Sequence, residues 1–206
     1  MGLDAARLDE GVQALARREP AFADALARHG VPPPRMRPRG LATLVRAIVA
    51  QQVSTAAAAA IWTRLEVLGD LADPATLLEA SPEALRAAGL SRQKIGYVQD
   101  LAAHVAGGRL PLHRLPADDE EAIALLSAVR GLGRWSAEIY LLFAEGRPDA
   151  FPAGDLALQV QAGRLFHDGA RPSERQLRAR AEPWRPYRGA AAMLLWHAYN
   201  ARLMPV

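Results

Sequence analysis

The sequence predicts an all-α protein built as two lobes. Apolar residues recur three and four positions apart in most windows of the 206-residue chain, which places them on one face of a helix. No stretch shows the alternation of apolar and polar residues that is typical of a half-buried strand. Residues 29–40, HGVPPPRMRPRG, carry four prolines and cannot form a helix, so we expect them to cross between two groups of helices.

The expected helices follow from this periodicity and from the residues that precede them. The run STAAAAA, residues 54–60, is a strong helix former inside the longest expected helix. Four starts carry an N-cap or the spacing of a capping box: Ser81, Ser91, Asp118 with Glu121, and Ser173 with Gln176. We expect helices at about 4–17, 20–29, 41–68, 75–79, 82–88, 92–106, 119–128, 134–145, 155–166, 174–181 and 187–202.

Composition excludes several kinds of site. There is no cysteine, which rules out disulfides, thiolate metal sites and cysteine nucleophiles. The charged N-terminus lacks the apolar core of a signal peptide, and no apolar run reaches the eighteen or so residues of a membrane span, so we expect a soluble, intracellular protein. The net charge is +3 and the pI is about 9.8, with Lys94 the only lysine. This basic excess is compatible with a polyanionic partner, but codon bias towards arginine explains it equally well.

The stretch RGLGRWSA, residues 130–137, joins two expected helices through a very short turn. Gly131 and Gly133 stand on either side of Leu132, and without a Cβ at these positions another molecule can approach the backbone closely. The first N–H groups of the next helix, with the positive end of its dipole, form an anion site, for which a DNA phosphate is the natural ligand. The alternative is a plain corner in which the glycines only end one helix and admit the next.

Asp155, in FPAGDLALQ, lies twenty-two residues beyond the second glycine and begins another expected helix. A carboxylate there can stabilise developing positive charge in a reaction. The alternative is an ordinary N-cap, a role that aspartate often fills. The two roles are compatible with each other.

These motifs together resemble the helix-hairpin-helix (HhH-GPD) DNA glycosylases, and within them the 3-methyladenine DNA glycosylase II branch. LLSAVRGLGRWSAEIYLL followed by FPAGDLALQV matches the hairpin and aspartate signature of that family. LVRAIVAQQVSTAAAAAIW, GLSRQKIGYVQDLA and PWRPYRGAAAMLLW match further motifs in the family order, so the resemblance covers roughly residues 40–200. It implies a two-lobed helical fold without the N-terminal α/β domain of some relatives. The hairpin lobe would span 40–147, and 1–39 with 148–206 would form the other lobe.

The resemblance also implies roles for individual residues. Asp155 falls on the catalytic aspartate, beside a cleft between the lobes, and Gln52 on the wedge that fills the space of an extruded base. Relatives need no further cofactor but hold a monovalent cation, Na⁺ or K⁺, under the hairpin. The hairpin phosphate grip would comprise Gly131, Leu132, Gly133, Arg134 and Ser136, and the cation would sit on the carbonyls of Ser127, Val129 and Leu132. The family usually has proline where this chain has Arg130.

A single carboxylate suits the excision of alkylated purines such as 3-methyladenine and 7-methylguanine. These bases are already cationic and leave as neutral molecules, so no general acid is needed. Bifunctional relatives carry lysine two residues past the second glycine, where this chain has Trp135, and Lys94 lies in another motif. We therefore expect a monofunctional enzyme that leaves the DNA strand intact.

Base excision from duplex DNA also needs an aromatic pocket for the flipped nucleotide. A cationic base stacked on an aromatic ring gains a cation–π interaction that a normal base lacks. The alternative is that the aromatic side chains are core residues at helical spacing. The candidates are Trp135, Tyr140, Trp184 and Tyr187.

Three functions remain open from the sequence. The first is a monomeric glycosylase that acts on duplex DNA containing alkylated bases. The second is a non-catalytic DNA-binding module, since the hairpin can grip phosphate without any chemistry. The third is a glycosylase for other damaged bases. Asp155 favours catalysis, because a module that only binds DNA gains nothing from a carboxylate that repels phosphate.

Overall fold

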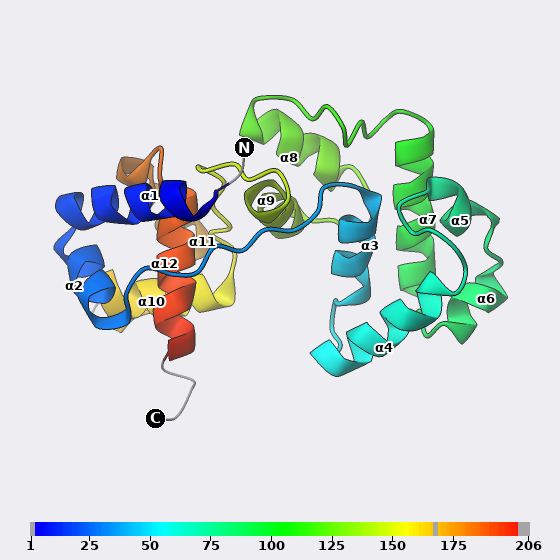
Figure 1. Cartoon of the computed structure of the whole chain (residues 1–206), viewed down its shortest axis with the longest axis horizontal. Helices are drawn as coiled ribbons and strands as arrows, with labels where there is room; N and C mark the ends of the chain where they lie inside the picture. The colour runs from blue at the N-terminus through cyan, green and yellow to red at the C-terminus, as the bar shows by residue number, and fades with distance from the viewer. Residues whose placement is uncertain (1–2, 167–168, 202–206) are drawn as a thin grey trace. The chain divides into compact units, whose positions relative to one another are not determined.

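The computed structural model describes residues 3–166 and 169–201, and in these ranges every regular element is a helix (Figure 1). The predicted all-α class is therefore confirmed. The chain divides into two compact units, residues 1–36 with 141–206 and residues 37–140, and the division falls within α9 (Arg134–Phe143). Within the described residues, no helix combines the length and the hydropathy that crossing a bilayer requires.

The unit of residues 37–140 is organised around α7. Residues Ile95, Val98, Leu101 and Ala102 recur at helical spacing and are buried, and α7 packs against α3, α5 and α6. Full burial of a valine or leucine side chain, as at Val98 and Leu101, stabilises the fold by roughly 1.5–3 kcal/mol. The helices of this unit besides α9 are α3 (Leu41–Val49), α4 (Thr55–Glu66), α5 (Pro74–Glu79), α6 (Pro82–Ala87), α7 (Arg92–Ala106) and α8 (Asp119–Ser127).

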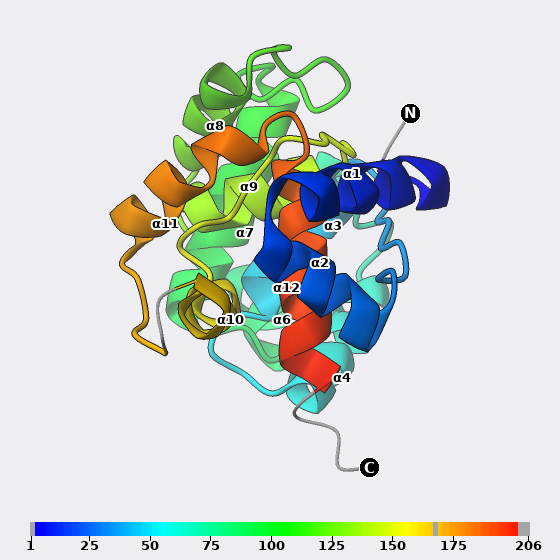
Figure 2. The ribbon, with the colours of Figure 1, turned by 90° about the vertical axis from the view of Figure 1, so that its left-hand side faces the viewer.

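The other unit is organised around α12, which lies among α1, α2 and α10 (Figure 2). The small side chains of Ala190, Ala191 and Ala192 are fully buried and let the neighbouring helices approach closely. A Cβ at Gly11 of α1 would lie only 2.8 Å from the Cβ of Ala190. The elements of this unit are α1 (Ala5–Arg18), α2 (Pro20–His29), α10 (Leu156–Phe166), α11 (Glu174–Arg180), a 3₁₀ turn (Glu182–Trp184) and α12 (Arg188–Ala201).

The predicted N-caps are present in the structure. The hydroxyls of Ser81 and Ser91 accept the backbone N–H groups of the residues three positions on. Ser173 and Gln176 form the reciprocal capping box, and Asp118 accepts the N–H of Glu121. These caps explain why most helix starts were predictable from the sequence.

The long helix expected over residues 41–68 is wrong. The structure has two helices there, α3 and α4, joined by a turn at residues 50–54. Ser54 accepts the N–H of Ala57 and so caps α4. Gln52 has a φ of 55°, which no helix residue can have. The strong helix-forming run therefore determines only α4.

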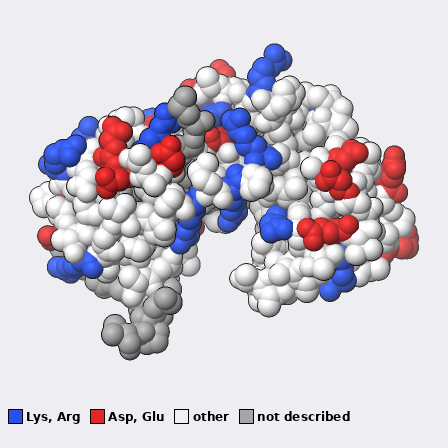
Figure 3. All heavy atoms as spheres, viewed as in Figure 1, with Lys and Arg blue, Asp and Glu red and all other residues white. Residues whose placement is uncertain are grey.

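Charge is unevenly spread over the unit of residues 37–140. Acidic side chains gather over its end formed by α5 and α6 (Figure 3). Carboxylates repel phosphate, so this end is a poor surface for a nucleic acid.

Candidate functional site

The hairpin between α8 and α9 is tightly packed on one side and open on the other. Gly131 has a φ of 86°, and a Cβ there would lie 2.3 Å from the ring of Tyr97. Leu132 is buried and anchors the turn in the core. At Gly133, by contrast, an added Cβ would meet nothing within 4 Å. Gly131 is thus required by the fold, and Gly133 leaves room for an approaching molecule.

The backbone N–H groups of the hairpin divide into two sets. The N–H of Leu132 donates to the carbonyl of Val129 at 3.1 Å, so the expectation that Leu132 belongs to the phosphate grip needs correction. The N–H groups of Gly131, Gly133 and Ser136 have no acceptor within residues 3–166 and 169–201. Unpaired N–H groups at the start of a helix form an anion site.

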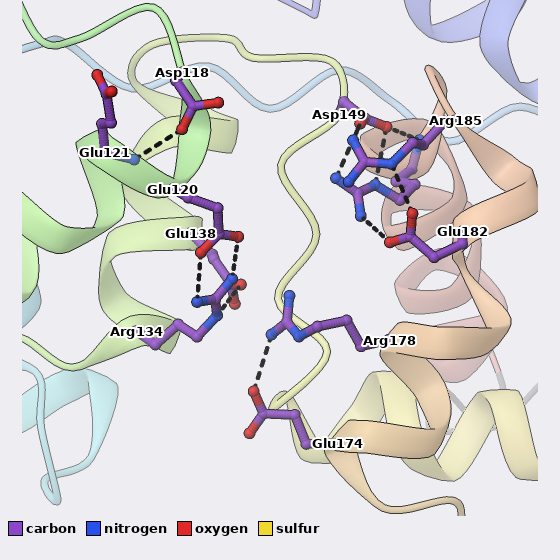
Figure 4. A network of polar contacts seen from close by, with 11 residues as sticks. Asp118, Glu120, Glu121, Arg134, Glu138, Asp149, Glu174, Arg178, Glu182 and Arg185 are labelled. Atoms are coloured by element: carbon purple, nitrogen blue, oxygen red, sulfur yellow. Dashed lines mark hydrogen bonds and ion pairs between the residues drawn. The ribbon is translucent and has the colours of Figure 1, made fainter.

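Arg134 is engaged by carboxylates. Its guanidinium donates two hydrogen bonds to Glu120 and a third, of 2.9 Å, to the buried carboxylate of Glu138 (Figure 4). The hydrogen bonds to Glu120 raise the pKa of Arg134 above its ordinary value. The resemblance predicts that Arg134 belongs to the phosphate grip. The structure pairs it with two acidic side chains, so its charge is already balanced.

Arg130 stands where the resemblance predicts a proline, and it makes a bond that proline cannot make. Its backbone N–H donates to Oδ2 of Asp100 at 2.9 Å, and its guanidinium lies 3.3 Å from Oδ1. His104 lies 3.7 Å from the same carboxylate. Burial raises the pKa of Asp100, but the Arg130 N–H bond and the charges of Arg130 and His104 outweigh it and lower that pKa overall. Asp100 therefore holds the start of the hairpin.

Gln52 stands on the strained turn between α3 and α4. It is the one non-glycine residue with a positive φ among the described residues, and its side chain is exposed. The preceding residue, Gln51, donates from Nε2 to the carbonyl of Gly131 at 2.8 Å, which ties the turn to the hairpin. Such strain persists only where the surroundings enforce it, and it is concentrated at functional sites.

A cavity of about 580 Å³ lies between this turn, the hairpin and the start of α7. It brings together Gln52, Gly131 and Gly133, three of the residues singled out in the sequence. Its lining comprises Gln51, Gln52, Val53, Ser91, Gln93, Lys94, Tyr97, Ser127, Val129, Gly131, Leu132 and Gly133.

The three carbonyls expected to hold a monovalent cation belong to residues that line the same cavity. Among the described residues, no donor reaches the carbonyl oxygens of Ser127 and Leu132, while that of Val129 accepts the Leu132 N–H. Oxygen atoms of this kind are suitable ligands for Na⁺ or K⁺, so these residues fit such an ion. Elsewhere in the described ranges, no cluster of three or more acidic or histidine side chains has the geometry of a metal site.

Asp155 precedes α10 and accepts two hydrogen bonds on one oxygen. Oδ1 accepts the backbone N–H of Leu158 at 3.1 Å, so Asp155 is an N-cap, as the alternative interpretation held. The same oxygen accepts the indole Nε1–H of Trp196 at 3.0 Å. The ring of Trp196 stacks on Phe143 with centroids 5.6 Å apart. Trp196 is the last residue of the motif PWRPYRGAAAMLLW. Nothing in the sequence pairs it with Asp155, and only the fold reveals this contact.

The loop that leads to Asp155 is fixed by a charged network (Figure 4). Asp149 accepts hydrogen bonds from Arg188, 3.0 Å away, and from Arg185, and both arginines also bind Glu182. The hydrogen bond from Arg185 lowers the pKa of Glu182. The backbone carbonyl of Pro148, the residue before Asp149, accepts the N–H of Gly189 at 2.7 Å. The loop is therefore anchored to the first turn of α12.

Two of the four aromatic candidates are core residues. Trp184 is 2% exposed and packs against Phe22, Phe151 and Phe166, so its assignment to a base pocket is wrong. Tyr140 is 3% exposed, and its hydroxyl accepts the N–H of Gly40 at 2.9 Å, which makes it a packing residue too.

The other two aromatic candidates are more accessible. Trp135 is 46% exposed. Tyr187 is partly exposed, donates to Glu10 and lies under the guanidinium of Arg18. Helical spacing alone could not separate these two from the buried pair.

The chain is similar to known proteins over most of its length. The family described as HhH-GPD superfamily base excision DNA repair protein matches residues 45–186. DNA-3-methyladenine glycosylase 1 of Schizosaccharomyces pombe is 32% identical over 160 residues, which cover 74% of this chain and 69% of that protein. DNA-3-methyladenine glycosylase 2 of Escherichia coli is 31% identical over 164 residues, covering 74% of this chain but only 55% of that protein.

A solved structure is similar over nearly the whole chain. The crystal structure of a DNA-3-methyladenine glycosidase from Bacillus halodurans superposes with a TM-score of 0.85 at 32% identity. The superposition covers 98% of this chain and 93% of that one.

Proposed function

Because the chain belongs to the HhH-GPD superfamily of base excision DNA repair proteins, we propose that it is a monomeric DNA glycosylase for alkylated purines. It hydrolyses the N-glycosidic bond of 3-methyladenine, 7-methylguanine and similar bases in duplex DNA. The observation that carries this proposal is the Asp155 carboxylate, oriented by Leu158 and Trp196. The names of the relatives support the choice of substrate.

Asp155 serves the reaction through its charge. As the bond from C1′ to the base nitrogen breaks, the electron pair leaves with the cationic base, which becomes neutral, and positive charge develops on the deoxyribose. A fixed carboxylate stabilises that charge, and water then adds to C1′ and loses a proton. The two donors to Oδ1 hold the carboxylate in one orientation, so little reorganisation is needed during the reaction.

The hairpin holds the DNA backbone. The N–H groups of Gly131 and Gly133 bind a phosphate. The carbonyls of Ser127, Val129 and Leu132 would hold a monovalent cation, which would add positive charge near that phosphate. Gln52 projects from its turn as the wedge that replaces the extruded nucleotide in the stack. These three parts border one cavity.

The enzyme is monofunctional. Trp135 stands at the position of the lysine that bifunctional relatives use, and the amine of Lys94 donates to the carbonyls of Val49 and Gln51. No amine therefore stands at the hairpin position from which a Schiff base with the sugar forms.

Base release from methylated duplex DNA tests the proposal. We expect wild-type protein to release 3-methyladenine and leave the strand intact. Asp155→Asn should bind abasic-site DNA but release base at least about a hundredfold more slowly, because it loses the charge that stabilises the transition state. Asp73→Asn is the matched control, since Asp73 also caps a helix, α5, and its loss of charge should leave activity unchanged.

The outcomes distinguish the candidate functions. Salt-sensitive DNA binding without release of any alkylated base would favour the non-catalytic module, and release of only deaminated or ring-extended purines would favour the other glycosylase. Full activity of Asp155→Asn would contradict the proposed mechanism.

A further inference from the structure

The only lysine of the chain, Lys94, donates hydrogen bonds to the turn between α3 and α4. Lys94, on the first turn of α7, donates from Nζ to the carbonyl of Val49 at 2.8 Å and to that of Gln51 at 2.6 Å. Val49 is the last residue of α3, and Gln51 lies in the turn that follows it. One ammonium group thus binds two backbone carbonyls that lie 45 and 43 positions before Lys94 in the sequence.

The turn needs such support because its backbone is strained. The left-handed conformation of Gln52 is disfavoured for any residue with a Cβ, and glycine is the usual residue there. The last carbonyls of a helix also lack partners within the helix. Charge-assisted bonds from Lys94 satisfy the carbonyl of Val49, the last residue of α3, and that of Gln51 in the turn. They also place a cation at the negative end of the α3 dipole.

Lys94 is bound by backbone dipoles. The residues that line its cavity include no aspartate or glutamate. Its ammonium is partly buried, and burial lowers the pKa of Lys94. A partly buried ammonium group needs hydrogen-bond partners, and here backbone carbonyls supply them in place of a carboxylate. Lys94 therefore has a structural role in holding the turn.

Gln51 connects the hydrogen bonds of Lys94 to the hairpin. The backbone carbonyl of Gln51 accepts from Lys94, and its side chain donates to the carbonyl of Gly131. Lys94, the Gln52 turn and the hairpin are therefore linked in one continuous set of hydrogen bonds.

We propose that Lys94 is a positioning residue for the wedge: its two hydrogen bonds hold residues 49–52 in the strained turn from which Gln52 enters the duplex. This inference rests on the proposed function in assigning Gln52 to the wedge. Lys94 touches neither the substrate nor the reacting atoms, and it acts through Gln52.

A double-mutant cycle tests the coupling of Lys94 to Gln52. We expect Lys94→Met and Gln52→Ala each to slow single-turnover base release at saturating enzyme by about tenfold, with the affinity for undamaged duplex changed less than about threefold. If Lys94 acts through Gln52, the double variant should be no slower than Gln52→Ala. Arg92→Met, which removes an exposed cation from the same turn of α7, is the matched control and should behave as wild type.

Chemical rescue separates positioning from folding. Since the chain contains no cysteine, Lys94→Cys introduces a single thiol that 2-bromoethylamine converts into a lysine analogue with an ammonium at nearly the same place. We expect the alkylated protein to recover most of the lost rate, and alkylation with iodoacetamide, which adds no charge, to recover none. Recovery with both reagents, or with neither in a protein that unfolds at the wild-type temperature, would overturn the inference.

A second readout does not depend on catalysis. 2-Aminopurine placed beside a tetrahydrofuran abasic site reports insertion of the wedge by its fluorescence, and Lys94→Met should lower the response to that of Gln52→Ala. If wild type releases no alkylated base, the proposed function fails and this fluorescence decides the role of Lys94. Additive rate losses in the cycle, or wild-type fluorescence with Lys94→Met, would refute that role.

Discussion

The indole N–H of Trp196 donates to Oδ1 of Asp155 at 3.0 Å, although 41 residues separate the two in the sequence. The contact joins α12 to the residue that caps α10. The Leu158 N–H binds the same oxygen, so two hydrogen bonds to Oδ1 fix the orientation of the whole carboxylate. The N-cap bond of Asp155 therefore also supports the catalytic role that we propose for it.

Trp196→Phe should slow base release while keeping the fold. Phenylalanine retains an aromatic ring to stack on Phe143 but has no N–H for Asp155. Loss of a hydrogen bond worth about 1–1.5 kcal/mol to an oriented carboxylate predicts a decrease of about tenfold in kcat. Single-turnover release from methylated duplex measures it, with thermal unfolding as the control for stability. An unchanged rate would show that Asp155 is oriented without this bond.

The two hairpin glycines should respond differently to alanine. At Gly131 a Cβ meets the Tyr97 ring and the φ is positive, so Gly131→Ala should destabilise the protein by about 2–4 kcal/mol. At Gly133 the space is open, so Gly133→Ala should fold normally. Its Cβ should nevertheless obstruct a phosphate and weaken DNA binding about tenfold.

Denaturant unfolding and fluorescence anisotropy with an abasic duplex separate these two effects. Normal stability of Gly131→Ala would contradict the packing argument. Wild-type DNA affinity of Gly133→Ala would contradict the proposed phosphate site.

Much of the fold was predictable because its signals are local. Helix starts such as those at Ser81, Ser91 and Ser173 depend on a cap within three residues, and the structure has each of them. The break at Gln52 was missed because the alanine run beside it is a stronger local signal than any in QQVS. The strained turn is held by Lys94, which lies far away in the sequence.

The site was predictable as a set of motifs, but its contacts were not. Spacing located the hairpin and Asp155, since each motif is short and contiguous. It could not show that Arg134 is also paired with Glu120 of α8, or that Trp184 is a core residue. The first contact forms only when α8 lies beside α9, and the second depends on the packing of Phe22, Phe151 and Phe166 around Trp184.

Asp100→Asn should destabilise the hairpin in a pH-dependent way. The folded pKa of Asp100 lies below its ordinary value, so its ionised form contributes stability above the unfolded pKa, which is about 3.9. That contribution is lost as the pH falls towards the lower folded pKa. Because Arg130 is largely exposed, the loss in the variant should be only about 1 kcal/mol at pH 7.

Urea unfolding of wild type and Asp100→Asn between pH 7 and pH 3 measures this difference. The two stability curves should converge at the acidic end, and Asp24→Asn, at an exposed position of α2, serves as a control for loss of one carboxylate. A difference that stays constant across this range would show that the charge of Asp100 is not what holds Arg130.

Trp135→Lys should introduce the strand-cleaving chemistry that we propose the wild type lacks. An amine at this exposed position can condense with the C1′ aldehyde of an abasic sugar, with loss of water, to give a Schiff base. Sodium borohydride should then trap a covalent complex of Trp135→Lys with abasic DNA and none with wild type. Lys94 cannot substitute, because its ammonium is bound to two backbone carbonyls. A trapped wild-type complex that disappears in Lys94→Met would place the reactive amine at Lys94 and contradict both the monofunctional mechanism and the positioning role of that residue.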